Sequence, residues 1–475
     1  MKKVLTLALV LSMALGLLAC GTSSGAAGNG GETISPAGEF KAGFGMVDVT
    51  PEGDLPLGSY GDNRMSTGVY TFLEARAVAV QDANGDMLIF LVGDTSWCPK
   101  AQADKIKATL SKDLGIPEDN ILTSGTHTHS SPEWVQTQNA NVVKFTEKYI
   151  AGMVKAAKQA VADLKPAKVY VGSAYTENLN FVRRYIMDDG SLFGDNFPGT
   201  GTTLVAHEKE PDNELQLMKF VREGGKDILI AQYQAHPHHD GRTTLIGGQI
   251  VATFREAVEA DMDIHVLAWN GAAGNLNSKS RIESEMPTKD PRAWGRLLWG
   301  YAKAVYNDMT PVETGLVQVR KTTITAKVNH EFDYLYEAAI AVKEYYTANN
   351  GDMALTEAYG AQWGIHSYQH AGRITANFKA GESDEIQMYS WSFGEVGGVL
   401  LPFEMYDTTG MQIKEGSPFE KTFIVGYAYP SYHGYIPTKE TFEVGGYEVD
   451  NCTYVAGTAE QMVEAYLGML SDMHN

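Results

Sequence analysis

Short apolar runs alternate with longer amphipathic segments through most of the chain, and this alternation predicts its secondary structure. Short apolar runs between polar residues or glycines are typical of buried strands, whereas apolar residues spaced three and four apart are typical of covering helices. This order of elements favours an α/β fold, with a mixed, largely parallel sheet core and flanking helices. Strands are predicted at 87–92, 120–123, 168–172, 227–234, 265–269, 385–392 and 397–401, and helices at 101–114, 142–164, 250–261, 334–349 and 354–371.

Residues 1–19 have the pattern of a bacterial lipoprotein signal peptide. Two lysines precede an apolar stretch, 4–18, that is too short to span a bilayer comfortably, and a lipobox-like sequence ends at Cys20. The pattern predicts cleavage before Cys20, lipidation of its sulfur and a flexible tether over residues 20–36. We therefore expect an extracytoplasmic protein that a lipid anchor alone holds to the bacterial cell membrane or outer membrane.

Residues 37–475 are expected to form one catalytic domain, because no repeat, linker or low-complexity tract interrupts them. The chain has a net charge of −20, which disfavours nucleic acid and anionic membrane surfaces as partners. Besides Cys20 it contains Cys98 and Cys452, too few cysteines for a four-thiolate zinc site. A disulfide between these two cysteines and a pair of buried free thiols are both open interpretations.

Two histidine clusters each follow an apolar run that is predicted to be a strand. His127 and His129 come after 120–123, and a second cluster, 235–240, comes after 227–234. Extended residues two positions apart share a face, so both histidines of a pair can face one cleft. In open α/β sheets, ligands bind beyond the carboxyl ends of the strands. Since imidazole is the commonest metal ligand and can also move a proton, the leading hypothesis is a metal-dependent hydrolase.

Two further segments supply oxygen ligands for such a site. Glu404 follows the apolar run 397–401, and Tyr435 lies in a loop rich in aromatic residues. Two histidines, one glutamate and one tyrosine would bind zinc and leave room for water. The sequence has no His-Glu-x-x-His motif, and its one Gly-x-Ser-x-Gly motif lies in the tether. A zincin site, a serine nucleophile elbow and a nucleotide site are therefore disfavoured.

In these motifs and their order, the chain resembles the catalytic N-terminal domain of the neutral/alkaline (non-lysosomal) ceramidases, roughly over residues 38–460. The matching motifs are 44–51, 126–130, 180–184, 236–237, 270–275 and 401–404, with two later tyrosines. The resemblance implies a zinc amidohydrolase, with one Zn²⁺ per chain, that cleaves N-acyl lipids or related linear amides. The residues that match the family's zinc ligands are His127, His236, Glu404 and Tyr435. Those that match its other active-site residues are His129, Arg183 and Tyr447.

The resemblance also implies a mechanism in which a zinc-activated water attacks the amide carbonyl. Tyr447 would stabilise the oxyanion, His129 would carry a proton to the leaving amine, and Arg183 would orient a polar group of the substrate.

The chain departs from the family pattern in two ways. Asn275 and Asn277 stand where the family has an aspartate and a serine. The family's C-terminal β-sandwich domain is expected to be absent, because the chain stops soon after the matching region. Two alternatives are thus open: a metal- or solute-binding surface lipoprotein, and a degenerate, non-catalytic member of the family.

Overall fold

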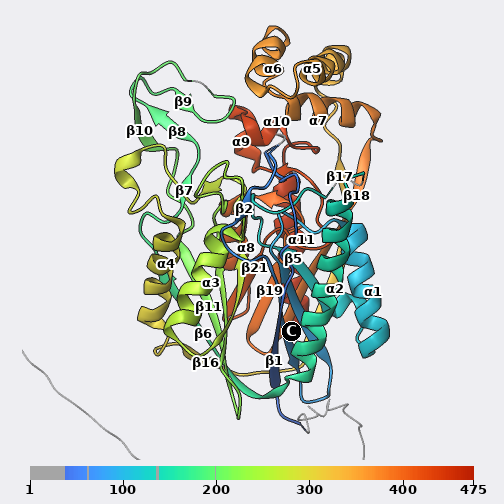
Figure 1. Ribbon diagram of the computed structural model, residues 1–475, viewed down its shortest axis with the longest axis vertical. Helices are drawn as coiled ribbons and strands as arrows, with labels where there is room; N and C mark the ends of the chain where they lie inside the picture. The colour runs from blue at the N-terminus through green and yellow to red at the C-terminus, as the bar shows by residue number, and fades with distance from the viewer. Residues whose placement is uncertain (1–37, 61–63, 135–137, 198, 475) are drawn as a thin grey trace, which may run out of the picture. The chain divides into compact units, whose positions relative to one another are not determined.

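A nine-stranded mixed sheet forms the centre of the computed structural model (Figure 1), which describes residues 38–60, 64–134, 138–197 and 199–474. The strand order is β14-β12-β11-β6-β1-β3-β4-β5, and β16 pairs with β6 beside this path. Cys20, with the predicted signal peptide and tether, lies outside the described residues. The strands of this sheet are β1 Lys41–Asp48, β3 Glu74–Gln81, β4 Met87–Gly93, β5 Ile121–Gly125, β6 Lys165–Tyr175, β11 Glu214–Arg222, β12 Ile228–Tyr233, β14 His265–Asn270 and β16 Thr310–Val312.

The α/β class and the mixed sheet are confirmed, but the expectation of a largely parallel sheet is wrong. Among the described strands of this sheet, only β12–β14 and β4–β5 pair in parallel. Tight hairpins explain the difference, because they can join only antiparallel strands. Asp82 Oδ1 accepts the backbone N–H groups of Asn84 and Asp86 at 2.9 and 3.0 Å between β3 and β4. Gly224, with a φ of +69°, turns the chain between β11 and β12.

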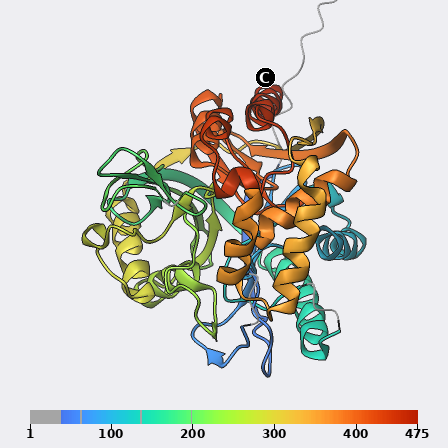
Figure 2. The ribbon, with the colours of Figure 1, turned by 90° about the horizontal axis from the view of Figure 1, so that it is seen from above.

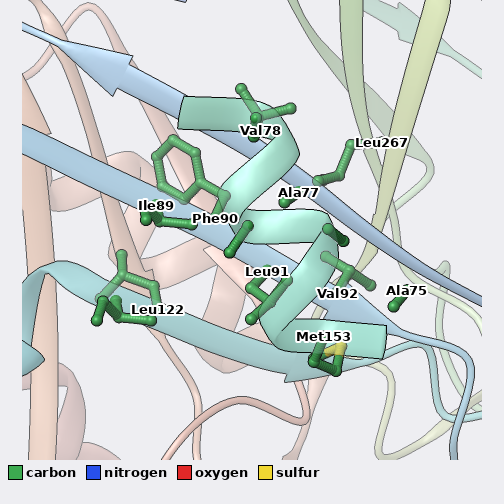
Figure 3. Packing of buried hydrophobic residues seen from close by; sticks show 14 of the residues in the cluster. Ala75, Ala77, Val78, Ile89, Phe90, Leu91, Val92, Leu122, Met153 and Leu267 are labelled. Atoms are coloured by element: carbon green, nitrogen blue, oxygen red, sulfur yellow. The ribbon is translucent and has the colours of Figure 1, made fainter. Parts of the chain in front are cut away.

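The sheet folds over where β1 meets β6. Strands β1 and β6 share two residue pairs, one of them Lys41–Pro166. Beyond this corner β1 continues to pair with β3, and β6 continues to pair with β11. In consequence β14 packs against β3, β4 and β5. The rings of Phe90 and Trp269 lie 5.1 Å apart across this core, and Figure 3 shows Phe90 and Leu267 among its buried side chains. The fold brings the carboxyl ends of β5, β12 and β14 to one end of the domain.

Helix α2 covers β1 at very short range. Asn139 caps the helix by accepting the backbone N–H groups of Asn141 and Val142. A Cβ atom at Gly43 or Gly45 would lie 2.1 Å from a carbonyl oxygen of α2, so the contact requires glycine on the strand. The helices are α1 Lys100–Leu114, α2 Ala140–Ala162, α3 Gln249–Asp261, α4 Pro291–Val305, α5 Tyr336–Ala348, α6 Met353–Gly360, α7 Tyr368–Lys379, α8 Asp407–Gly416, α9 Lys439–Val444, α10 Tyr447–Asp450 and α11 Thr458–His474.

The C-terminal part of the chain adds a second sheet and a group of three helices, α5 to α7 (Figures 1 and 2). The single helix expected at 354–371 is wrong. Helix α6 ends at Gly360, the chain reverses at Gly364 with a φ of +72°, and Ser367 caps the start of α7. The strands of the second sheet are β17 Val317–Lys327, β18 Ser383–Phe393, β19 Val396–Leu400 and β21 Lys421–Val425.

Cys98 and Cys452 are both buried free thiols, which decides between the two interpretations of the sequence. Burial raises the pKa of Cys98 to about 12 and that of Cys452 to about 11, so neither is a reactive thiolate at neutral pH. Within the described residues, no helix is long and apolar enough to cross a membrane.

Candidate metal centre

The two histidine clusters meet at the carboxyl ends of β5, β12 and β14. Asn270, the last residue of β14, ties them together. Its side-chain Nδ2 donates to the carbonyl of Thr126 at 3.3 Å and to that of Ala235 at 3.0 Å, and its Oδ1 accepts the N–H of Ala235 at 3.2 Å. A single buried amide therefore holds the residues that precede His127 and His236 in fixed positions.

The Nε2 atoms of His127 and His236 point at the same carboxylate. His236 Nε2 lies 3.1 Å and His127 Nε2 lies 3.5 Å from Oε2 of Glu404. The opposite ring nitrogens are fixed by backbone carbonyls. His127 Nδ1 donates to Ser96 at 2.8 Å, and His236 Nδ1 donates to Ala273 at 2.8 Å. Carbonyl oxygens only accept, so in neutral rings the proton is on Nδ1 and both Nε2 atoms present lone pairs.

A cation fits this arrangement better than the bare side chains do. Burial, together with the charge of Arg183, lowers the pKa of His236 to about 4, so the ring is neutral at neutral pH. Its Nε2 lone pair then faces an oxygen of Glu404 that also only accepts. Two imidazole nitrogens and one carboxylate oxygen, each a zinc donor and each converging on one point, are the donor set that zinc binds. Carbonyls on the far ring nitrogens orient the ligands, as is usual for metal-binding histidines.

Glu404 and Tyr435 are neighbours, although 31 positions separate them in the sequence. They face each other in a short parallel pair, β20 Glu404–Met405 with β22 Tyr435–Ile436. Gly274 lies against this pair, because a Cβ there would be 2.5 Å from the Glu404 carbonyl oxygen. Burial and the charge of Glu404 raise the pKa of Tyr435 well above its usual range, with Arg183 acting in the opposite direction. The structure thus brings the predicted oxygen ligands to the same place as the histidines.

His129 lies beside the two predicted histidine ligands. Its Nε2 lies 3.2 Å from Nε2 of His127, and the ligand atoms of His127, His129 and His236 all lie within 4.8 Å of one another. The side-chain oxygen of Gln249 accepts the backbone N–H of His129 at 2.8 Å and fixes this segment. The geometry permits His129 to be a third imidazole ligand or a proton carrier beside two ligands.

Arg183 lies beside the tyrosines of the predicted site. Its Nε donates to Glu448 Oε1 at 2.7 Å, and its guanidinium carbon lies 5.2 Å from the Tyr435 ring centroid and 5.6 Å from that of Tyr447. Nη2 of Arg183 is buried and has no hydrogen-bond partner among the described residues. Because Glu448 holds one side of the guanidinium, the other side is available to a substrate.

Tyr427 and His238 also lie at the centre; the sequence did not indicate Tyr427, and it indicated His238 only as part of the cluster 235–240. Tyr427 stacks on His127 with ring centroids 3.8 Å apart, and both residues have a left-handed backbone, with φ of +52° and +63°. Such strain in residues other than glycine concentrates at functional sites. His238 lies 5.1 Å from His129 and 5.5 Å from His236, measured between ring centroids. His238 forms a His-x-His pair with His236, as His129 does with His127. No local sequence pattern indicates Tyr427.

The two asparagines that depart from the family pattern have different environments. Asn275 is fully buried and exchanges hydrogen bonds with Asp407: its Nδ2 donates to Asp407 Oδ1 at 2.8 Å, and its Oδ1 accepts the Asp407 N–H at 2.9 Å. Asn275 therefore holds the backbone at this point. Asn277 lines the cavity at the metal centre, and its Oδ1 has no hydrogen-bond partner among the described residues.

A cavity of about 1200 Å³ opens onto the metal centre. It is lined by His127, His129, His236, Glu404, Tyr435, Arg183 and Tyr447. Residues of α6 and α7 line it as well, so these helices cover part of its mouth. The volume exceeds that of typical drug-sized pockets and can hold an extended acyl chain.

A second group of possible metal ligands, His366, His370 and Asp450, lies at the junction of α7 and α10. Here the carboxylate already has hydrogen-bond donors, although Nε2 of the buried His370 has no partner among the described residues. Asp450 Oδ2 accepts from His366 Nδ1 at 2.6 Å and from the Asn196 side chain at 2.7 Å. His370 Nδ1 accepts the backbone N–H of His366 at 3.3 Å. These contacts need no ion and make the group a structural clasp between the two helices.

Comparison with known sequences finds one family. Residues 40–248 match the family model described as neutral/alkaline non-lysosomal ceramidase, N-terminal. The chain is 26% identical over 199 residues to neutral ceramidase of Pseudomonas aeruginosa, an alignment that covers 39% of this chain and 28% of that protein. It is 22% identical over 260 residues to neutral ceramidase A of Dictyostelium discoideum, covering 48% and 36%. The alignments thus span about a quarter to a third of these relatives.

Comparison with solved structures extends the likeness beyond the matched residues. The crystal structure of neutral ceramidase from Pseudomonas aeruginosa superposes with a TM-score of 0.69 at 17% identity, over 92% of this chain and 74% of that one. At this identity the match shows the fold. The resemblance to the ceramidase family that the motifs predicted is confirmed.

Proposed function

We propose that this protein is a zinc-dependent hydrolase of linear amide bonds that acts on ceramide or related N-acyl lipids. The observation that carries the proposal is the convergence of His127, His236 and Glu404 on one point, with their remaining ring nitrogens fixed by carbonyls. The open cavity at this point and the similarity to neutral ceramidases support an enzyme over a closed structural zinc site.

His127, His236 and Glu404 would hold the ion, with Tyr435 as the fourth ligand. Zinc bound there would polarise the substrate carbonyl and lower the pKa of an attacking water. His129 would carry a proton to the leaving amine, while the Tyr447 hydroxyl would donate to the oxygen on which negative charge develops. Arg183, held by Glu448, would use its open side to orient a hydroxyl or other polar group of the substrate.

A metal- or solute-binding lipoprotein is a weaker proposal for this site. Simple metal storage has no use for a cavity of about 1200 Å³ in which an arginine and two tyrosines lie beside the ligands. Loss of the family aspartate and serine does not by itself favour a non-catalytic protein. Asn275 is fully engaged with Asp407, and a water nucleophile requires no serine at position 277.

A substrate screen tests the function. The purified chain, loaded with zinc, is expected to hydrolyse at least one of ceramide, N-acyl ethanolamine, N-acyl amino acid and fatty ester, and a chelator should abolish the activity. Restoration by added Zn²⁺ separates metal loss from denaturation. Binding of zinc without turnover of any of these compounds would support the binding-protein alternative.

The proposed location is the outer face of a bacterial membrane, with Cys20 as the lipidated residue. Cys20→Ser should release the protein from the membrane fraction and leave its specific activity unchanged, because the proposed site residues all lie between positions 127 and 447. Fractionation followed by activity assay checks both parts. Retention of the variant in the membrane fraction would show that another anchor exists.

A further inference from the structure

Five cationic side chains line the cavity at the metal centre, although the chain as a whole carries a net charge of −20. They are Arg183, Arg242, Lys279, Arg281 and Arg373. Four carboxylates, those of Glu133, Asp195, Glu357 and Glu404, line the same cavity, so an anionic ligand is favoured only where a cation is not already paired with a carboxylate. The partners of each cation show which of them is available to a ligand.

Most of these cations are already engaged. Arg183 pairs with Glu448 at 2.7 Å, and Arg281 Nη2 pairs with Asp195 Oδ1 at 3.0 Å. Arg373 donates to the Thr453 hydroxyl, and the Arg242 guanidinium lies 5.3 Å from the ring centroid of Tyr60. Each arginine thus has a contact within the protein, although Nη2 of Arg183 and Nε of Arg373 are buried without a hydrogen-bond partner among the described residues.

Lys279 differs from them. It is half-buried, and within the described part of the chain its Nζ makes no hydrogen bond and no ion pair. The ammonium rests against the backbone at Gly241, where an added Cβ would lie 3.4 Å from Nζ. Burial lowers the pKa of Lys279, with the charge of Asp240 acting in the opposite direction. A partly desolvated cation without a partner costs stability, and such groups concentrate at binding sites.

The backbone places Lys279 beside the predicted zinc ligands. Asn277, two residues before it, forms a β-bridge with His236, and the N–H of Ser278 donates to the His236 carbonyl at 3.3 Å. Burial and nearby positive charges, that of Lys279 among them, lower the pKa of His238, whose ring centroid lies 5.5 Å from that of His236. An acidic group bound to Lys279 would therefore belong to the same substrate molecule as an amide at the metal centre.

We infer that Lys279 binds an acidic group of the substrate, and that the preferred substrates are N-acyl compounds with a carboxylate, of which N-acyl amino acids are the simplest. The inference rests on the proposed amide hydrolysis. Water adds across the amide C–N bond, so the products are a fatty acid and an amino acid. Ceramide is uncharged and offers Lys279 no ionic partner.

The experiment compares N-dodecanoylglycine with N-dodecanoylethanolamine, which replaces the carboxylate by a hydroxymethyl group. The wild type should have the higher kcat/KM for the glycine conjugate. In Lys279→Met the ratio of the two kcat/KM values should fall about 10- to 100-fold, mainly through KM, because a charge-assisted hydrogen bond is lost. Lys279→Arg should restore part of the ratio. Lys289→Met, an exposed lysine paired with Glu283 outside the cavity, is the matched control and should leave the ratio unchanged.

An unchanged ratio in an active Lys279→Met enzyme would overturn the inference and leave the proposed function intact. Failure of the wild type to hydrolyse any amide would instead contradict the proposed function. Calorimetric binding of a non-hydrolysable ketone analogue of N-dodecanoylglycine, in which a methylene group replaces the amide N–H, to the wild type and to Lys279→Gln tests the inference without turnover. Weaker binding by the variant supports it, and equal affinity rejects it.

Discussion

Two clusters in this chain each contain two histidines and one carboxylate, but their hydrogen bonding differs. His127, His236 and Glu404 lie at the carboxyl ends of the central strands; His366, His370 and Asp450 join α7 to α10. In the first cluster, backbone carbonyls accept hydrogen bonds from the Nδ1 atoms of both histidines. The Nε2 lone pairs of His236 and His127 therefore face Oε2 of Glu404, at 3.1 and 3.5 Å. In the second, N–H groups of His366 and Asn196 meet the carboxylate directly.

The difference shows that proximity of histidines and carboxylates does not identify a metal site. What matters is where each ring nitrogen directs its proton, and the neighbouring backbone decides this. In the first cluster, the lone pairs of His127 and His236 and the oxygen of Glu404 are all acceptors, an arrangement that a bound cation would satisfy. In the second, the Asp450 carboxylate already accepts two hydrogen bonds, although the buried His370 Nε2 has no partner among the described residues.

The largest effect is expected from the predicted ligands. His127→Ala and His236→Ala should each reduce zinc from about one per chain to trace amounts, because a water in place of one imidazole binds the ion much less tightly. Loss of the ion should lower kcat/KM by more than about 10³-fold. His370→Ala is the matched control and should keep both. Metal analysis by mass spectrometry, combined with amide hydrolysis, gives the result; zinc retained by the double variant of His127 and His236 would refute the assignment.

His129 decides how many imidazoles the first cluster contributes. If it carries the proton, His129→Ala should keep zinc and lose about two to four decades of kcat. A ring nitrogen that binds zinc through its lone pair cannot also accept a proton, so the proton carrier must be a different histidine from the zinc ligands. Zinc content and kcat are measured on the same preparation. A zinc-free His129→Ala protein would make this residue a ligand, and full activity would exclude it from the mechanism.

The smallest effect is expected at the second cluster and depends on pH. The hydrogen bond to Asp450 raises the pKa of His366 above its usual value. The resulting stability is fully present below the unfolded pKa and is lost as pH rises through the folded pKa. Because the side chain is 45% exposed, His366→Gln should cost at most about 1 kcal/mol at about pH 5.5 and almost nothing at about pH 9.

Urea unfolding at the two pH values measures this difference. Asp450→Asn should remove most of the same pH dependence, since it removes the negative charge that favours protonated His366. If instead added Zn²⁺ stabilises the wild type and not His366→Gln, the second cluster binds metal and the comparison fails.

The sequence contained the parts of the site that local pattern can encode. Histidines after predicted strands indicated the position of His127 and His236, the apolar run before Glu404 and the aromatic loop around Tyr435 indicated the oxygen ligands, and the resemblance assigned all four as zinc ligands. Tyr427 could not be predicted, because its left-handed backbone and its stacking on His127 arise from tertiary packing. The direction of several strands was mispredicted. The alternation of helices and strands favoured parallel pairing, whereas tight turns at Asp82 and Gly224 join antiparallel strands.

Anomalous diffraction at the zinc absorption edge, from crystals of the zinc-loaded chain, tests the central claim most directly. The account predicts one strong peak between His127 Nε2, His236 Nε2 and the Glu404 carboxylate, and none at Asp450. A peak beside His366 and Asp450, or no peak between the paired histidines in a protein that carries zinc in solution, would contradict it.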